Sequence, residues 1–414
     1  MVVSRLILSA AVVTVLLSSA FAQAPPISAD WPQWRGPNRD GAATSWVEPK
    51  AWPETLTAKW KVPVGIGYAT PILVGDRVFV FTRQDADEVL QAIDAATGRP
   101  IWQARYPAPF KMSPAADRHG DGPKATPTFN AGKLYTLGMG GVVSAFDAAT
   151  GKRLWQTGPS ATPAPLYGTA MSPLVDRGLV IVHVGGHDKG ALTAYDPDTG
   201  VVKWHWDGDG PAYNAPIAVD LGGTRQVVTF TQDNLIGVAE ATGELLWQRP
   251  YKTRATQNTV TPIAYGGTLI VSGIDMPVVA IRVTKGASGW TTEDVWSNPD
   301  VPLYMTTGVI VGDMLVGMPH KNSGQFFALD AKTGRTLWTS APRQATNAAM
   351  LRVGNQIFAL KDDAELLVLS PSRTAFEPLH RYSVADSATW AQPAISRNRI
   401  YVKDLNSLAM FTIE

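Results

Sequence analysis

Residues 146–156, Phe-Asp-Ala-Ala-Thr-Gly-Lys-Arg-Leu-Trp-Gln, are typical of the end of one strand, a tight turn and the start of a second strand. Asp147 and Thr150 can bond the nearby backbone, and Gly151 can adopt a positive φ at no steric cost. The pattern occurs five times, and in every copy a Trp follows the turn glycine by four residues. The other copies are 94–98 with Trp102, 196–200 with Trp204, 239–243 with Trp247 (Ala replaces the Asp) and 330–334 with Trp338. Five copies indicate a repeat and not an isolated site.

Tryptophans at this place in the repeat define its length. They are Trp60, Trp102, Trp155, Trp204, Trp247, Trp296 and Trp338. The steps between them are 42, 53, 49, 43, 49 and 42 residues, and a further step of 42 reaches His380 in a degenerate strand. Periods of about 40 to 50 residues with several strands per unit are typical of β-propellers. We therefore expect these tryptophans to be structural wedges that dock adjacent blades together.

Each unit divides into four short strands, which we name A to D. In the first unit they are residues 68–74, 77–82, 89–93 and 100–104, and in the second 125–130, 133–139, 142–146 and 153–157. Residues 390–414 provide strands A, B and C only, whereas residues 56–62 provide a strand D without A, B or C. We expect this N-terminal strand to complete the last blade, which removes a free sheet edge. The prediction is an all-β, eight-bladed propeller; seven blades would follow if the seventh unit, which lacks the turn and the Trp, is not a full blade.

The N-terminus predicts export. Arg5 precedes an apolar run over residues 6–17, and Ala20-Phe21-Ala22 has the small-x-small form of a cleavage site. The run is shorter than the roughly 20 residues that a membrane span needs. We expect a signal peptide over residues 1–22, cleavage near Ala22, and a periplasmic or secreted mature chain without a membrane span. A Trp- and Pro-rich N-terminal strap over residues 23–55 and the propeller over residues 56–414 would follow.

Composition excludes some partners and anchors. The 414 residues carry a formal net charge of +1, which gives no electrostatic case for nucleic acid. The chain contains no Cys, so we expect neither disulfides nor a lipid-modified N-terminal cysteine. The expected partners are a protein or a small ligand at the propeller face, and the expected oligomeric state is a monomer.

The Asp-x-x-Thr-Gly-x-x-x-Trp units resemble the tryptophan-docking repeats of the pyrroloquinoline-quinone-like (PQQ-like) β-propeller superfamily, over about residues 56–414. That superfamily includes quinoprotein alcohol and glucose dehydrogenases. It also includes a non-catalytic periplasmic scaffold of the outer-membrane β-barrel assembly machinery (BamB-like), an eight-bladed ring with N-terminal closure to which the layout is most similar. Residues 30–41 resemble a Trp-Pro-x-Trp-Arg-Gly-Pro opening of exported repeat proteins of unassigned function.

The resemblance implies an exported, non-catalytic protein-interaction scaffold or ligand-binding module, with no cofactor. The alternative that it implies is a dehydrogenase that uses PQQ with calcium to oxidise alcohols or sugars. Such an enzyme needs carboxylates and Asn for calcium and a catalytic Asp, and no such set can be carried over to this chain. The adjacent cysteines of the alcohol dehydrogenase branch are absent, whereas the cysteine-free glucose dehydrogenase branch keeps the enzyme open. A module that binds cell-wall polysaccharide is a third possibility.

Two polar patterns are weak candidates for a metal site. His183 and His187 are four residues apart, but they straddle a strand and its Gly turn, whereas zinc ligands at that spacing usually lie on a helix or hairpin knuckle with further ligands nearby. Asp117 and Asp121 flank a glycine but lack the fuller oxygen set typical of calcium, and we interpret residues 117–122 as an exposed loop. We expect no metal site and no catalytic residue.

One set of positions varies while its neighbours are regular. It lies two residues before the small or hydroxyl residue that opens strand A, on the same face of the strand. The eight positions are Tyr68, Lys124, Ala170, Tyr213, Thr259, Met305, Asn347 and Trp390. Because strand A is innermost in a propeller, this ring should lie at one mouth of the central channel, where it is either plain lining or a ligand site. Our candidate ligand-binding residues are Tyr68, Lys124, Tyr213, Met305, Asn347 and Trp390, which would suit a peptide, a sugar or a flat organic ligand.

Overall fold

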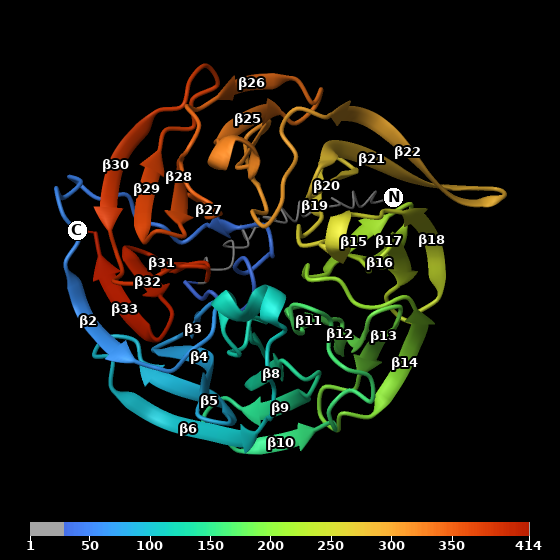
Figure 1. Ribbon diagram of the computed structural model, residues 1–414, viewed down its shortest axis with the longest axis horizontal. Helices are drawn as coiled ribbons and strands as arrows, with labels where there is room; N and C mark the ends of the chain where they lie inside the picture. The colour runs from blue at the N-terminus through green and yellow to red at the C-terminus, as the bar shows by residue number, and fades with distance from the viewer. Residues whose placement is uncertain (1–28, 414) are drawn as a thin grey trace, which may run out of the picture.

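Eight sheets surround a central channel, each built on four antiparallel strands, and one of them gains a short fifth strand in parallel (Figure 1). The computed structural model describes residues 29–413. Consecutive strands pair within each sheet, so each repeat forms one blade. The prediction of an eight-bladed propeller is confirmed. The seventh unit is a full blade, and His380 lies in its outer strand in place of the repeat Trp.

The first four blades follow the chain in order. Blade 1 consists of β3 (Ile72–Val74), β4 (Arg77–Gln84), β5 (Asp87–Asp94) and β6 (Pro100–Pro107). Blade 2 consists of β7 (Thr128–Asn130), β8 (Lys133–Leu137), β9 (Val143–Asp147) and β10 (Arg153–Gln156). Blade 3 consists of β11 (Leu174–Asp176), β12 (Leu179–Gly186), β13 (Lys189–Tyr195) and β14 (Val202–Gly208). Blade 4 consists of β15 (Ile217–Leu221), β16 (Thr224–Phe230), β17 (Asn234–Ala239) and β18 (Leu245–Pro250).

The last four blades complete the ring. Blade 5 consists of β19 (Ile263–Tyr265), β20 (Thr268–Gly273), β21 (Met276–Gly286) and β22 (Gly289–Asn298). Blade 6 consists of β23 (Val309–Val311), β24 (Met314–Gly317), β25 (Phe327–Asp330) and β26 (Thr336–Thr339). Blade 7 consists of β27 (Ala348–Val353), β28 (Gln356–Lys361), β29 (Glu365–Leu369) and β30 (Pro378–Ser383), and blade 8 of β31 (Ala394–Ser396), β32 (Arg399–Lys403), β33 (Ser407–Thr412) and β2 (Ala58–Pro63). Three short 3₁₀ turns lie in the connections, at η1 (Pro114–His119), η2 (Arg254–Thr256) and η3 (Lys321–Ser323).

The N-terminal strand closes the ring as predicted. β2 pairs antiparallel with β33, with Trp60 opposite Met410 and Val62 opposite Leu408. A second N-terminal strand, β1 (Ala42–Ala43), adds to blade 7 by pairing in parallel with β27. The two ends of the chain therefore share one sheet, and blade 8 presents no unpaired β33 edge.

The predicted strand A is too long at its start. In blade 1 it begins at Ile72 and not at residue 68, because Pro71 cannot donate to the ladder. The backbone N–H groups of Tyr68 and Ala69 donate instead to the carbonyl oxygen of Pro123, just before blade 2. In blade 1, the segment before strand A therefore lies outside the ladder and bonds to the start of the next unit.

Hydroxyl groups at the start of strand A link several neighbouring blades. In each link, a backbone N–H of one blade donates to the Ser or Thr side chain of the next. The bonds are Gln392 N to Thr70 Oγ1 (3.2 Å), Thr70 N to Thr126 Oγ1 (3.2 Å), Thr126 N to Ser172 Oγ (2.9 Å) and Thr261 N to Thr307 Oγ1 (3.1 Å). The small hydroxyl residue of the motif is therefore a connection between blades around the channel.

Six of the seven repeat tryptophans reach the next blade. Each of these indole Nε1–H groups donates to a backbone carbonyl in the turn between strands C and D of its neighbour. The pairs are Trp60 with Ala95, Trp102 with Ala148, Trp155 with Pro197, Trp204 with Glu240, Trp296 with Ala331 and Trp338 with Ser372. Trp247 instead bonds Gln226 of its own blade, because blade 5 has a long β21–β22 hairpin in place of the turn.

The turn glycine is fixed by both its backbone and its neighbour. Gly151 has φ +75°, and a Cβ there would lie 2.4 Å from the Trp102 ring. We expect Gly151→Ala to lower the free energy of unfolding by about 2–4 kcal/mol, combining backbone strain with overpacking. Gly132→Ala is the matched control, since Gly132 has φ +79° but nothing within 4 Å of its Cβ position, so about 1 kcal/mol is expected. Urea denaturation measures both, and equal losses would show that the ring contact contributes nothing.

Candidate functional site

A cavity of about 270 Å³ opens at one mouth of the central channel. All eight varied positions line it. They are Tyr68, Lys124, Ala170, Tyr213, Thr259, Met305, Asn347 and Trp390. The structure thus brings the six candidate residues together in one site, although they come from six different repeats. Their role in binding a ligand stays a prediction.

The other lining residues were not among the candidates. They are Trp34, Arg118, His119, Tyr167, Ser172, Ala215, Gln257 and Tyr304. Arg118 and His119 belong to η1, which lies over the inner side of the ring (Figure 1). Arg118 is exposed, as expected for residues 117–122, whereas His119 is half-buried. Residues 117–122 stand out in the sequence as a run of charged residues and glycines. Because this loop lies outside the strand repeat, its position in the ring could not be predicted.

A hydrogen-bonded aromatic wall forms one side of the cavity. Gln257 Nε2 donates to the Tyr167 hydroxyl (2.6 Å), and the Tyr304 hydroxyl donates to Gln257 Oε1 (2.7 Å). The Tyr167 and Tyr213 rings are 5.3 Å apart at 74°, an edge-to-face pair. Burial raises the pKa of Tyr213 to about 12. This wall is held in place by its own hydrogen bonds.

Two cationic side chains, Lys124 and Arg118, also line the cavity. Lys124 Nζ donates to the Tyr167 carbonyl oxygen (2.8 Å), and burial lowers the pKa of this lysine to about 8. Burial, together with the charges of Lys124 and Arg118, lowers the pKa of His119 to about 4, so this imidazole is neutral at pH 7. His119 packs edge-to-face on Trp390 at 4.8 Å. No Asp or Glu is among the lining residues.

An N-terminal segment forms the floor of the cavity and blocks the channel below it. We call this segment, residues 30–43, the plug; it is the blue segment at the centre of the ring in Figure 1. It contacts blades 1 to 7. The contacts are Trp31 with Leu73, Pro32 with Phe129, Arg39 with Ser172, Pro173 and Pro216, Trp34 with Thr261, Arg35 with Thr307 and Gly308, and β1 with β27. The cavity is therefore open at one end only.

Two buried arginines anchor the plug through backbone carbonyls. Arg39 donates to Ser172, Pro173 and Pro216 at 3.0–3.2 Å and to Gln33 Oε1 at 3.0 Å. Arg35 donates to the carbonyls of Thr307 and Gly308 and to that of Asp40, at 2.7–3.1 Å. Burial lowers the pKa of Arg39 to about 9 and that of Arg35 to about 10, the latter offset in part by the Asp40 charge.

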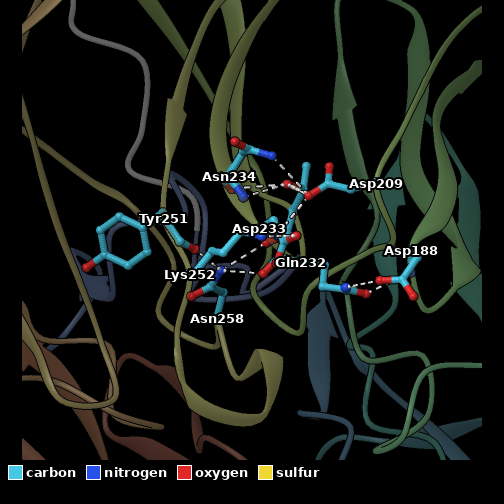
Figure 2. A network of polar contacts seen from close by, with 9 residues as sticks. Asp188, Asp209, Gln232, Asp233, Asn234, Tyr251, Lys252 and Asn258 are labelled. Atoms are coloured by element: carbon cyan, nitrogen blue, oxygen red, sulfur yellow. Dashed lines mark hydrogen bonds and ion pairs between the residues drawn. The ribbon is translucent and has the colours of Figure 1, made fainter.

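A polar network holds the rim of the cavity near blades 3 to 5 (Figure 2). Asn258 Nδ2 donates to the carbonyls of Thr231, Gln232 and Tyr251 at 3.0–3.2 Å. In the same network Asp209 Oδ2 accepts the Thr231 hydroxyl at 2.7 Å. Since Asn258 lies between Gln257 and Thr259, the network fixes the segment that carries these two lining residues.

The histidine pair that resembled a metal site has other partners. His183 is buried in β12 with Nε2 at 3.2 Å from the Asp209 carbonyl oxygen, and His187 Nε2 accepts the N–H of Leu166. Over residues 29–413, no group of three or more His, Cys, Asp or Glu is placed to hold a metal ion.

The lining does not fit PQQ with calcium. Calcium in proteins takes six to eight oxygen ligands, mostly carboxylates and carbonyls, and the cavity presents two cationic side chains and no carboxylate. A divalent cation placed beside Lys124 and Arg118 would be repelled. The donor set therefore disagrees with the cofactor that the superfamily resemblance implies for its enzymes.

Within residues 29–413, no helix has the length and apolar character needed to cross a membrane. The signal peptide expected over residues 1–22 lies outside the described residues.

Comparison with known proteins gives two kinds of relative. A BamB of Yersinia pestis is 25% identical over 305 residues, covering 69% of this chain and 70% of that protein. The quinohemoprotein alcohol dehydrogenase ADH-IIG of Pseudomonas putida is 26% identical over 331 residues, covering 70% of this chain. The match spans only 42% of the length of that dehydrogenase.

Similar solved structures include members of the same two groups, BamB and the quinohemoprotein alcohol dehydrogenases. BamB from Moraxella catarrhalis gives a TM-score of 0.62 at 16% identity, covering 87% of this chain and 98% of that one. The ADHIIG structure from Pseudomonas putida HK5 gives 0.63 at 16% identity, covering 93% and 80%. At such identities the likeness concerns the fold alone. The family model described as outer membrane protein assembly factor BamB matches residues 85–340 and 307–410, so the chain belongs to the PQQ-like β-propeller family that this model represents.

Proposed function

We propose that the protein is an exported, non-catalytic β-propeller, a monomer that acts in the cell envelope as an interaction scaffold or ligand-binding module. The composition of the channel cavity carries the proposal: aromatic and cationic side chains line it, without a carboxylate. A dehydrogenase of the quinone type would need a carboxylate base and calcium ligands there. A preformed cavity without these groups suits binding without turnover.

The names of the relatives support an envelope partner. The matching family model and several relatives are described as outer-membrane protein assembly factors. A propeller offers two faces of loops on a rigid ring, which suits contacts with another protein. We propose a protein partner on these loops, and a small ligand in the cavity, as separate contacts.

The second candidate is a PQQ-dependent dehydrogenase. It is favoured by the quinohemoprotein relatives and by the aromatic side chains at the channel mouth, and disfavoured by the charge of the lining. A module that binds cell-wall polysaccharide is a third candidate, and polymer pull-down without turnover would support it.

Reconstitution separates binding from catalysis. We expect purified protein incubated with PQQ and calcium to reduce an artificial electron acceptor no faster than a protein-free control, with alcohols or sugars as substrates. The reason is that the cavity contains no carboxylate to hold the metal or abstract a proton. The measurement is dye bleaching together with the cofactor absorbance spectrum. Substrate-dependent turnover would refute the non-catalytic proposal.

A further inference from the structure

One connection between blades extends over the cavity. Residues 108–127, which join β6 to β7, form the longest link between consecutive blades of the described chain, and the next longest is 157–173. The link contains η1, which lies over the inner side of the ring (Figure 1). Its Arg118 and His119 side chains line the cavity. Connections longer than about 12–15 residues are uncommon in compact domains and are often functional.

A single arginine pins both ends of this excursion. Arg83, which is buried in β4, donates from Nη2 to the carbonyl oxygen of Ala108 (2.8 Å) and from Nε to that of Asp121 (2.9 Å). Directly after Asp121 the chain is closely packed, because a Cβ at Gly122 would lie 2.4 Å from the Ile66 carbonyl oxygen. The two ends of the excursion are therefore held against blade 1 as a fixed base.

Between these two ends the excursion has no polar attachment to the ring. Every hydrogen bond that residues 109–120 make within the described chain ends inside the excursion itself. The bonds are Met112 N to Asp121 Oδ1, Ala116 N to the Ser113 carbonyl, Gly120 N to the Asp117 carbonyl and Arg118 Nε to His119 Nε2. Over residues 29–413, no ion pair joins this segment to the ring either.

Apolar packing and one ring contact hold the segment down. Met112 and Ala116 are buried against Met139, which lies in the β8–β9 connection. At the tip, His119 packs edge-to-face on Trp390 of the connection before β31, with ring centroids 4.8 Å apart. Contacts of this kind leave no buried polar group unpaired when they separate. They suit a segment that opens and closes.

We propose that residues 109–120 form a hinged lid over the channel cavity. The lid turns on the base held by Arg83, and the contact of His119 with Trp390 is its latch, so that separation of these two side chains widens the mouth towards blade 8. This inference rests on the ligand-binding part of the proposed function, since a lid matters only where something enters the cavity, and adds how entry is controlled.

Thiol labelling measures the opening directly, because the chain contains no Cys. Ala116→Cys places one thiol on the buried underside of the lid, and the control Ala145→Cys places one in the core of blade 2; both alanines are 0% exposed. We expect N-ethylmaleimide to label Ala116→Cys about 100-fold faster or more, relative to the rates of the denatured variants, since a lid opens without unfolding of the ring. Equal rates would overturn the proposal. Met112→Cys, on the same underside, is the reporter should Ala116→Cys fail to fold.

The latch is tested in the Ala116→Cys background. His119→Ala removes the ring contact with Trp390, and we expect the labelling rate to rise about two- to tenfold, as the loss of one edge-to-face contact allows. Lys111→Ala is the control, because it truncates an exposed side chain of the same segment, and it should leave the rate unchanged. An unchanged rate in His119→Ala, or an equal rise in both variants, would overturn the assignment of the latch.

Labelling needs no ligand, so its outcome is separable from that of the proposed function. Turnover with PQQ and calcium would refute the non-catalytic proposal whatever the thiols do. Equal labelling of the two thiols, with no turnover, would refute the lid and leave a cavity with a fixed mouth.

Discussion

Replacing Arg39 with methionine is expected to lower the free energy of unfolding by about 3–6 kcal/mol, although it removes a buried charge. A pKa of about 9 in place of 12.5 means that burial of this charge costs about 5 kcal/mol. Against this, Arg39 makes four hydrogen bonds, and bonds to a charged donor contribute about 1.5–3 kcal/mol each. The lost bonds outweigh the relieved burial.

The control for this prediction is Arg335→Met, which removes an exposed arginine from a blade turn. Urea denaturation should give a change within about 0.5 kcal/mol for the control. In Arg39→Met the plug should also loosen, so that Trp34 no longer floors the cavity. An Arg39→Met protein as stable as Arg335→Met would mean that the plug is not anchored by its guanidinium groups.

The ring and its mouth could be predicted from sequence because they are periodic. Trp102 and its equivalents recur in seven of the eight blades, and the spacing reaches His380 in the remaining one, so the number of blades and the closing strand followed from counting. The positions of Tyr68, Lys124 and Trp390 followed in the same way, since each has the same offset from a recurring strand start. Because the pattern is periodic, an interpretation of one strand start gives the equivalent position in all eight blades.

The plug could not be predicted in detail because its contacts have no sequence signature. Arg35 reaches Thr307 and Gly308 across 272 and 273 residues, and its acceptors are backbone carbonyls, which every residue carries. The Trp-rich composition of the strap does not indicate that Trp34 would floor the cavity. Tyr167 and Tyr304 were missed for a related reason, since both lie in connections whose lengths differ from blade to blade.

Trp60→Ala should have the most far-reaching effect of any docking tryptophan, because Trp60 lies at the seam that closes the ring. Its indole donates to the Ala95 carbonyl of blade 1 and lies 6.0 Å from the Tyr401 ring in blade 8. Truncation of such a large side chain costs about 3–5 kcal/mol when it is fully buried, and Trp60 is half-buried, so we expect about 2–4 kcal/mol. The β2–β33 pairing should then open locally, since no covalent link holds this seam.

The matched control is Trp155→Ala, which removes an equally half-buried indole that bonds the Pro197 carbonyl at an internal boundary between blades. Its blades stay linked by the chain, so a similar loss of stability should leave β33 protected. Native-state hydrogen exchange of the β33 amides measures the difference. Only in Trp60→Ala should these amides exchange through local opening, at a free energy below that of global unfolding. An opened β33 is an exposed sheet edge, so light scattering should also detect association of the Trp60→Ala protein at high concentration. Identical exchange and association for the two variants would mean that β2 is held by its ladder alone, and that the seam behaves like any other boundary in the ring.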